Sequence, residues 1–339
     1  MTCIRCGKAY PTEAGDWFTG CPDCLAAGYP ASVSAPLLPG SENVSVLGEG
    51  NTPLVRLGAL DCWVKNEGQN PSGSHKDRLS PLVVARAAAL GRRGVVAASS
   101  GNQGASLALY AAAAGVPCAI ITTLQINPIW ARAISLTGAK LIMVDEPKQR
   151  WRLMQQMVEQ EGWYPATNYV DPPVGSNPFG VQGYKAIARE ILTRETPDVV
   201  VVPCSRGDVL WGIHAGFTEA GANPRLVAVE PFPRLTRVLA GEDYRGNFPG
   251  RTGSLTSIGG STVTYQAVEA VRKSNGCAFA VGEPEAAGAR ERLAQAGIYA
   301  EGSSAVVLAA LQGLRETGWV KPDDRVVLVV TSNGYKDVT

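Results

Sequence analysis

The sequence predicts an α/β fold in which parallel-type sheets are covered by helices. Short apolar runs typical of buried strands alternate along the chain with longer runs of helical periodicity. The chain has 339 residues, 45% of them hydrophobic, which is enough for a large core divided between two lobes. Strands are expected at residues 95–98, 119–122, 140–144, 199–202, 226–229 and 326–330, and helices at residues 77–90, 102–114, 151–161, 183–193 and 303–317.

The first 30 residues form a separate, cysteine-rich segment. Cys3 and Cys6 make one Cys-x-x-Cys pair, Cys21 and Cys24 make a second, and 14 residues separate the pairs. This spacing is close to that of a zinc ribbon, so the four thiols are the predicted ligands of a structural zinc ion. Two disulfides, or a ribbon that has lost its metal, are the alternatives.

The next informative segment spans residues 70–78 and contains Lys76. Pro71 and Gly73 interrupt any helix before the lysine, and the apolar run after Asp77 predicts a helix. An amine at a helix start beside Arg78 is expected to have a lowered pKa and to attack an aldehyde as a neutral nucleophile. A solvated surface lysine is the alternative reading of this segment alone.

Three polar loops follow apolar strands: residues 99–104, residues 205–208 and residues 331–334. Ligands bind at the carboxyl ends of strands in open α/β sheets. Backbone N–H groups at a helix start suit a carboxylate in the first loop, residues 99–104, and a phosphate ester in the second, residues 205–208. Each loop alone could be an ordinary strand-to-helix turn. Together with Lys76, they predict a site for pyridoxal phosphate (PLP).

These segments resemble the threonine synthase-like members of the fold type II (tryptophan synthase β-like) PLP enzymes, from about residue 48 to residue 337. The resemblance implies a two-lobed enzyme that carries the zinc-ribbon-like segment at its N-terminus. The expected divisions are the ribbon (1–30), a larger lobe with the cofactor phosphate site (31–84 and 166–339) and a smaller mobile lobe (85–165). The expected assembly is a homodimer.

The resemblance also implies roles for individual residues. Lys76 would form the Schiff base with the cofactor, Asn102 would bond its ring hydroxyl, and Thr331 would meet the pyridine nitrogen. A hydroxyl at that nitrogen leaves the ring uncharged, which suits elimination chemistry. The cofactor phosphate would be held by Ser205, Arg206, Gly207, Asp208 and Val209, and the substrate would be bound by Ser99, Ser100, Gly101, Gln103 and His75.

Two departures from the family pattern bear on the site. His75 stands where the family usually has phenylalanine, and it could move protons, contact the cofactor phosphate or only fill the same space. Gly180 stands where the family has an arginine that contacts the substrate's own phosphate. The loss of this arginine weakens the case for phosphohomoserine, and Gly180→Arg is expected to restore its use. Lys185, Arg132 or Arg206 could supply the charge instead.

The predicted activity is a PLP-dependent elimination or replacement at the β or γ carbon of an amino acid, as in threonine synthases. The alternatives are a serine or threonine deaminase, a cysteine or cysteate synthase-like β-replacement enzyme, and a non-catalytic homologue. The joint presence of Lys76, Asn102 and Thr331 argues against the last.

Composition excludes other classes of partner. The net charge is +1, from 31 basic and 30 acidic residues, so there is no electrostatic case for nucleic acid or for an anionic membrane. No apolar run approaches the ~20 residues that cross a bilayer, and no signal peptide is recognisable. A cytoplasmic enzyme acting on a small amino acid is expected.

Overall fold

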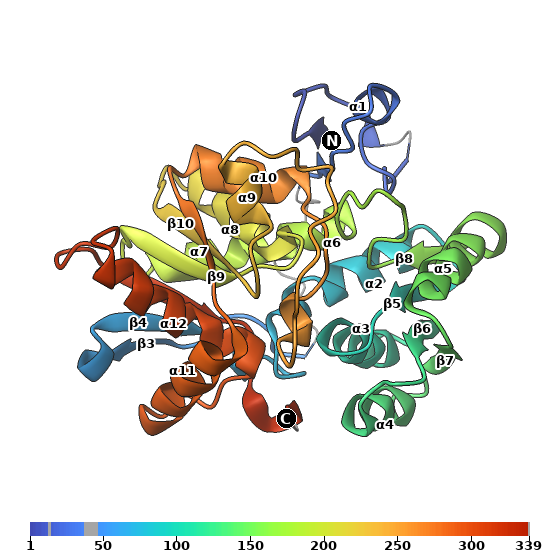
Figure 1. Cartoon of the computed structure of the whole chain (residues 1–339). Coiled ribbons are helices and arrows are strands. Elements are labelled where there is room, and N and C mark those ends of the chain that lie inside the picture. Colours follow the sequence, from blue (N-terminus) through green and yellow to red (C-terminus); the bar gives the residue numbers. More distant parts are fainter. Residues whose placement is uncertain (13–14, 37–46, 338–339) are drawn as a thin grey trace. The chain divides into compact units, whose positions relative to one another are not determined.

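The computed structural model describes residues 1–12, 15–36 and 47–337. The chain divides into two compact units, each built on its own sheet (Figure 1). Unit 1 comprises Met1–Gly50 and Asn70–Gly183, and unit 2 comprises Asn51–Gln69 and Tyr184–Thr339. The expected lobe boundaries stay a prediction, and residues 37–46 of the expected larger lobe lie outside the described residues.

The sheet of unit 1 has four parallel strands in the order β7-β6-β5-β8. Their bounds are β5 (Gly94–Ala98), β6 (Cys118–Thr123), β7 (Lys140–Val144) and β8 (Trp163–Pro165). The strands expected at 95–98, 119–122 and 140–144 are confirmed, whereas the sequence analysis missed β8, which is only three residues long.

Helices cover both faces of this sheet because neighbouring residues of a strand point to opposite sides. Ile121 packs with Met154 and Met157 of α5, whereas Ile120 faces Gly104 of α3. The helices of unit 1 are α1 (Pro22–Ala26), α2 (Ser80–Ala89), α3 (Asn102–Ala113), α4 (Pro128–Leu136), α5 (Pro147–Glu161) and α6 (Pro178–Val181). The expected helices at 102–114 and 151–161 are confirmed, although α5 begins four residues earlier.

The cysteine-rich segment belongs to unit 1. Its strand β1 (Thr2–Cys3) pairs antiparallel with β2 (Val33–Ser34). An ion pair of 2.8 Å between Asp16 and Arg86 ties the segment to α2, and the ring of Phe18 meets that of Tyr164 in β8 edge-on, with centroids 5.0 Å apart.

The sheet of unit 2 has six strands in the order β11-β10-β9-β12-β4-β3, and every pair except β3 with β4 is parallel. The strands expected at 199–202, 226–229 and 326–330 are confirmed. The bounds are β3 (Leu54–Leu57), β4 (Cys62–Asn66), β9 (Val199–Pro203), β10 (Arg225–Glu230), β11 (Cys277–Ala280) and β12 (Val326–Val330).

One face of this sheet buries the apolar helix α12, whose residues form a single core with Val199, Val201, Leu328 and Val330. The helices of unit 2 are α7 (Lys185–Leu192), α8 (Asp208–Glu219), α9 (Leu235–Leu239), α10 (Tyr265–Lys273), α11 (Glu283–Gln295) and α12 (Gly302–Glu316). The helices expected at 183–193 and 303–317 therefore match α7 and α12 closely.

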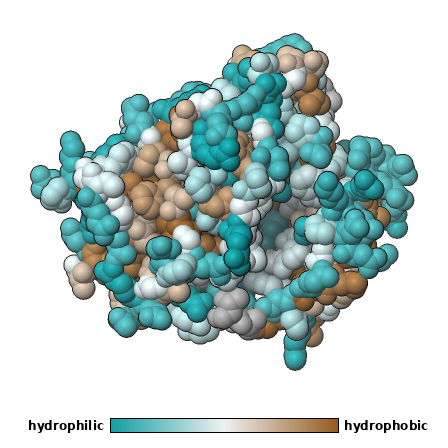
Figure 2. Space-filling model, in the orientation of Figure 1, coloured by the Kyte–Doolittle hydropathy of each residue, from teal (hydrophilic) through white to brown (hydrophobic). Residues whose placement is uncertain are grey.

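Hydrophilic residues cover much of the face shown in Figure 2, with apolar patches between them. Within the described ranges, none of the helices combines the length and the apolar character needed to cross a membrane.

Candidate active site

Lys76 lies in a short 3-10 helix, η5 (His75–Arg78), and not at the start of the α-helix. The helix expected from residue 77 is confirmed as α2, although it begins three residues later, at Ser80. Pro81 explains this start, because proline has no N–H and fits the first turn of an α-helix. The backbone N–H of Lys76 donates to the Ser74 hydroxyl at 3.4 Å. The lysine side chain is half-buried, so it is partly accessible.

Asp77, next to the lysine, is fully buried and anchors this turn. Its carboxylate accepts hydrogen bonds from the Ser72 N–H at 2.6 Å, from the Ser72 hydroxyl at 2.5 Å and from the Ser106 hydroxyl at 2.6 Å. Ser106 also bonds the Ser80 hydroxyl at 2.7 Å, and Gln103 donates to Ser80 at 3.2 Å. A hydrogen-bond chain thus joins the lysine turn to the predicted substrate loop. The sequence analysis missed this role of Asp77.

The predicted substrate loop, residues 99–104, connects β5 to α3. The Ser99 hydroxyl accepts hydrogen bonds from the N–H groups of Gly101, at 3.3 Å, and of Gly104, at 3.0 Å, and so fixes the turn. Asn102 and Gln103, the first residues of α3, are each 8% exposed. His75 is also buried, and its role stays a prediction.

The predicted phosphate loop, residues 205–209, leads from β9 into α8 in unit 2. Gly207 has a φ of +88°, and a Cβ there would lie 2.5 Å from the Ala267 Cβ, so only glycine fits. No side chain caps α8, and its first N–H groups therefore suit a phosphate. The carboxylate of Asp208 is held by the Gln266 side chain. Val209 is buried in the first turn of α8.

A second segment, residues 258–267, holds this loop from outside. The Ser205 hydroxyl donates to the Gly259 carbonyl at 2.7 Å, and the Thr264 hydroxyl donates to the Arg206 carbonyl. These two hydrogen bonds hold the Ser205 side chain and the Arg206 carbonyl, and so fix the first half of the loop.

Arg234 links the two segments, and the sequence analysis missed it. It is 1% exposed and donates to the carbonyls of Cys204 at 3.0 Å, of Ile258 at 3.1 Å and of Gly260 at 2.5 Å. The Glu230 carboxylate, 3.4 Å away, balances its charge. The only signal in the sequence is an acid and a base four residues apart.

Thr331 follows β12, the neighbour of β9, so the phosphate loop and Thr331 lie at the same edge of the sheet. The hydroxyls of Thr331 and Ser304 are 2.8 Å apart, and Ser304 also accepts the Ser332 N–H at 2.9 Å. Ser304, in the first turn of α12, thus fixes the position of the Thr331 hydroxyl.

The four N-terminal cysteines form the expected cluster. Their sulfur atoms all lie within 4.8 Å of one another, and all four are free thiols, so the disulfide alternative is not observed. Burial raises the pKa of the Cys21 thiol, but hydrogen bonds with Tyr10 and from the Cys24 N–H lower it to about 7, whereas burial raises the pKa values of Cys3 and Cys24. A thiolate is the form that binds a metal, so this cluster fits a tetrahedral ion.

Gly180, in α6, lies against the apolar side of α2. A Cβ at this position would be 2.6 Å from the Leu79 Cγ and 2.7 Å from a methyl group of Val83. The interpretation of Gly180 as a simple gap that arginine could refill is therefore wrong, because Leu79 and Val83 fill the space. Lys185 cannot supply the missing charge either, since it is 5% exposed and paired with Glu219.

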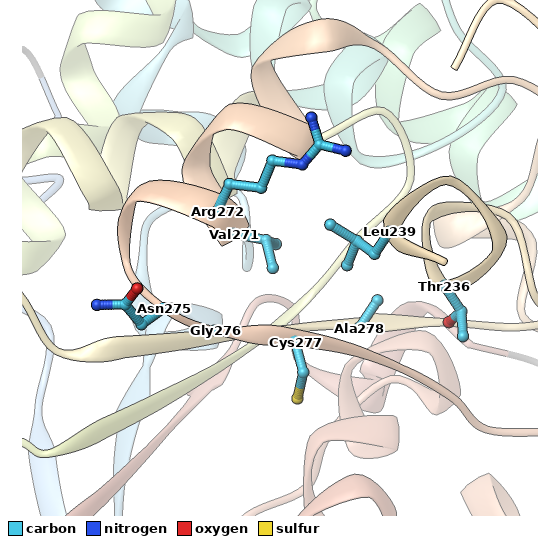
Figure 3. Close-up of a pocket in the computed structure, with 8 residues that line it drawn as sticks. All are labelled: Thr236, Leu239, Val271, Arg272, Asn275, Gly276, Cys277 and Ala278. Atoms are coloured by element: carbon cyan, nitrogen blue, oxygen red, sulfur yellow. The ribbon is translucent and has the colours of Figure 1, made fainter. Parts of the chain in front are cut away.

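A pocket of about 320 Å³ lies among α9, α10 and β11 in unit 2 (Figure 3). It contains none of the predicted site residues, and its lining is largely apolar with one charged side chain, Arg272. This pocket therefore offers no group that would carry the predicted chemistry.

Residues 46–332 match the family described as pyridoxal-phosphate dependent enzyme. The chain belongs to this family. PLP is therefore its cofactor, and the start of α8, which no side chain caps and which follows the left-handed turn at Gly207, fits a phosphate group.

Similar proteins agree with this membership. The chain is 32% identical over 312 residues to threonine synthase of Methanocaldococcus jannaschii. This match covers 85% of this chain and 76% of the relative. It is 30% identical to threonine synthase of Halalkalibacterium halodurans, over 91% of this chain and 87% of the relative. Among solved structures, O-ureido-L-serine synthase superposes with a TM-score of 0.70 at 26% identity, covering 86% of this chain and 92% of that one.

Membership of the pyridoxal-phosphate dependent family and these relatives indicate a class of reaction for the chain. It is a PLP-dependent elimination or replacement at the β or γ carbon of an amino acid. The α/β fold with parallel sheets and covering helices is that of fold type II.

Proposed function

We propose that this PLP-dependent enzyme is threonine synthase-like and converts phosphohomoserine, or a related amino acid with a leaving group, into threonine or a modified amino acid. The observation that carries this proposal is the 32% identity to a threonine synthase over 85% of the chain. We further expect a homodimer in the cytoplasm.

In this proposal Lys76 holds the cofactor and, once released from it, moves the α-proton of the substrate. Asn102 bonds the ring hydroxyl, Thr331 the pyridine nitrogen, and residues 205–209 the phosphate. Bound PLP supplies an acceptor for the electron pair that remains at Cα. Ser304 fixes the uncharged Thr331 hydroxyl, and a hydroxyl at the pyridine nitrogen would leave the ring uncharged. Ser99, Ser100, Gly101 and Gln103 bind the substrate, with His75 beside them.

A second candidate function is β-replacement on a serine derivative. The packing of Leu79 and Val83 over Gly180 favours it, because no arginine can occupy that position for a substrate phosphate. The likeness to O-ureido-L-serine synthase is consistent with this alternative.

A parallel substrate assay distinguishes the two functions. Purified enzyme is mixed separately with phosphohomoserine, phosphoserine, acetylserine, serine and threonine. We expect phosphohomoserine to release phosphate and to form threonine only weakly, because no arginine stands at position 180 to bind its phosphate. A phosphate assay and amino-acid chromatography measure the two products. Consumption of acetylserine or phosphoserine alone would instead establish β-replacement, and ammonia from serine or threonine would establish a deaminase. An enzyme that holds PLP and turns over none of the five would refute the proposed function.

We also propose that Cys3, Cys6, Cys21 and Cys24 hold one structural zinc ion. Freshly purified protein should contain about one zinc per chain by metal analysis. A chelator should expose the N-terminal segment to proteolysis while the bound cofactor keeps its absorbance, because neither Lys76 nor the phosphate loop belongs to the cysteine-rich segment of residues 1–30.

Cys6→Ser should lower the zinc content, and Cys277→Ser, which changes a cysteine outside the cluster, should not. Protein with little zinc and four freely alkylated N-terminal thiols would refute the metal site.

A further inference from the structure

Arg234 is a buried cation just after β10 in unit 2. Its side chain is 1% exposed and lies 3.4 Å from the Glu230 carboxylate. Its Nη1 donates to the Gly260 carbonyl at 2.5 Å, and its Nη2 donates to the carbonyls of Cys204 at 3.0 Å and of Ile258 at 3.1 Å. A guanidinium is costly to bury unless its N–H groups are paired, so these carbonyls are held firmly.

Glu230, the last residue of β10, fixes the arginine at its base. The Glu230 carboxylate accepts hydrogen bonds from the N–H groups of Arg234 at 3.0 Å, of Leu235 at 2.8 Å and of Thr236 at 2.9 Å. Glu230 is also 1% exposed, and β10 pairs with β9, from which the phosphate loop begins. The pair of Glu230 and Arg234 is therefore mounted on the sheet itself.

The contact with Cys204 determines which way the first peptide of the phosphate loop faces. This peptide is trans, and the C=O and N–H of a trans peptide point in opposite directions. Because Arg234 holds the Cys204 carbonyl, the N–H of Ser205 points away from Arg234. None of the described groups accepts a hydrogen bond from this N–H.

A second peptide of the loop is held in the same manner. The Arg206 carbonyl accepts the Thr264 hydroxyl, so the N–H of Gly207 points away from Thr264. This N–H also has no acceptor among the described groups, and it directly precedes the uncapped start of α8. The loop therefore has its carbonyls paired and its N–H donors unused.

We propose that Arg234, fixed by Glu230, is a positioning residue for the cofactor phosphate. By holding the Cys204 carbonyl on its own side, it keeps this oxygen from facing an anion and leaves the Ser205 N–H to bind it, together with the start of α8. The placing of the phosphate in this loop rests on the proposed function, whereas the fixed orientation of the peptide rests on these contacts.

The test compares Arg234→Met with Arg237→Met, which changes an exposed arginine of α9. Cofactor-free protein is titrated with PLP and with pyridoxal, which has the same aldehyde but no phosphate, and absorbance reports binding. Wild type and Arg237→Met should bind PLP far more tightly than pyridoxal. Arg234→Met should weaken PLP about tenfold to hundredfold and leave pyridoxal unchanged, because a charge-assisted hydrogen bond to the phosphate is lost.

Phosphorus NMR gives an independent readout. The phosphate signal of PLP bound to Arg234→Met should move toward that of free PLP, and Arg237→Met should keep the wild-type signal. If Arg234→Met does not fold, Glu230→Gln, which keeps an acceptor for the start of α9 but removes the charge beside Arg234, should lower the ratio of PLP to pyridoxal affinity.

Three results would overturn the proposal. An unchanged ratio in Arg234→Met, or in Glu230→Gln where that variant decides, would refute the positioning role of Arg234. An equal loss of PLP and pyridoxal binding would do the same, because it would show that Arg234 only supports the fold. A wild type that binds the two ligands equally would also refute the placing of the phosphate at residues 205–209, which belongs to the proposed function.

Discussion

Lys76→Ala is expected to abolish turnover by orders of magnitude and to leave a protein that no longer holds its cofactor covalently. The wild-type enzyme should be yellow, and borohydride should attach PLP irreversibly to the peptide that contains Lys76. The physical reason is that the only amine in the anchored turn of residues 72–80 is that of Lys76. Peptide mass spectrometry after reduction locates the label.

The matched control is Lys140→Ala, which removes an exposed lysine from β7 in the same unit. This variant should remain yellow and retain activity. A label on any lysine other than Lys76, or a colourless wild type after addition of PLP, would contradict the assignment.

Gly180→Arg is expected to lower the free energy of unfolding by several kcal/mol and not to improve the use of phosphohomoserine. The new side chain would meet Leu79, which is 0% exposed, and Val83, also 0% exposed. Overpacking of a tight core costs about 1–3 kcal/mol, and a buried unpaired charge adds to this. Denaturant unfolding with a spectroscopic probe measures the loss.

Gly288→Arg is the control, because a Cβ on Gly288 in α11 meets nothing within 4 Å. This substitution should leave stability unchanged or slightly increased, since arginine favours a helix more than glycine does. The double variant Leu79→Ala/Gly180→Arg should lose less free energy of unfolding than the two single variants lose together, because the first change makes room for the second. Wild-type stability of Gly180→Arg together with faster phosphohomoserine turnover would show that position 180 does face the substrate.

The sequence alone predicted the strands β5, β6, β7, β9, β10 and β12 and the places of the polar loops, whereas β3, β4, β8, β11 and the strand orders came from the tertiary structure. Runs such as residues 199–202 and 326–330 are apolar on both faces, which only a strand buried in a parallel sheet permits, and both are β-strands with every residue buried. The cysteine cluster followed equally from spacing, because two Cys-x-x-Cys turns bring their sulfurs together wherever the turns meet.

Hydrophobic periodicity did not predict the start of α2 or the short strand β8, because single residues next to these elements decide where they begin and end. The helix expected from residue 77 begins instead at Ser80, and the lysine occupies a separate 3-10 turn capped by Ser74. The short strand β8 was missed because a three-residue run containing proline has no periodicity to detect.

Only the tertiary structure decided which side chains support the site. Arg150 meets Ser100 across 50 residues, Asp77 meets Ser106 across 29, and Arg234 meets Cys204 across 30. By resemblance, an arginine introduced at position 180 would contact a substrate phosphate, yet Leu79 packs against this position and leaves no room for the side chain. Strand and helix periodicity reflect which face of an element is buried, and they carry no information on which distant residue will lie opposite. Those contacts arise only when the strands and helices of each unit pack together.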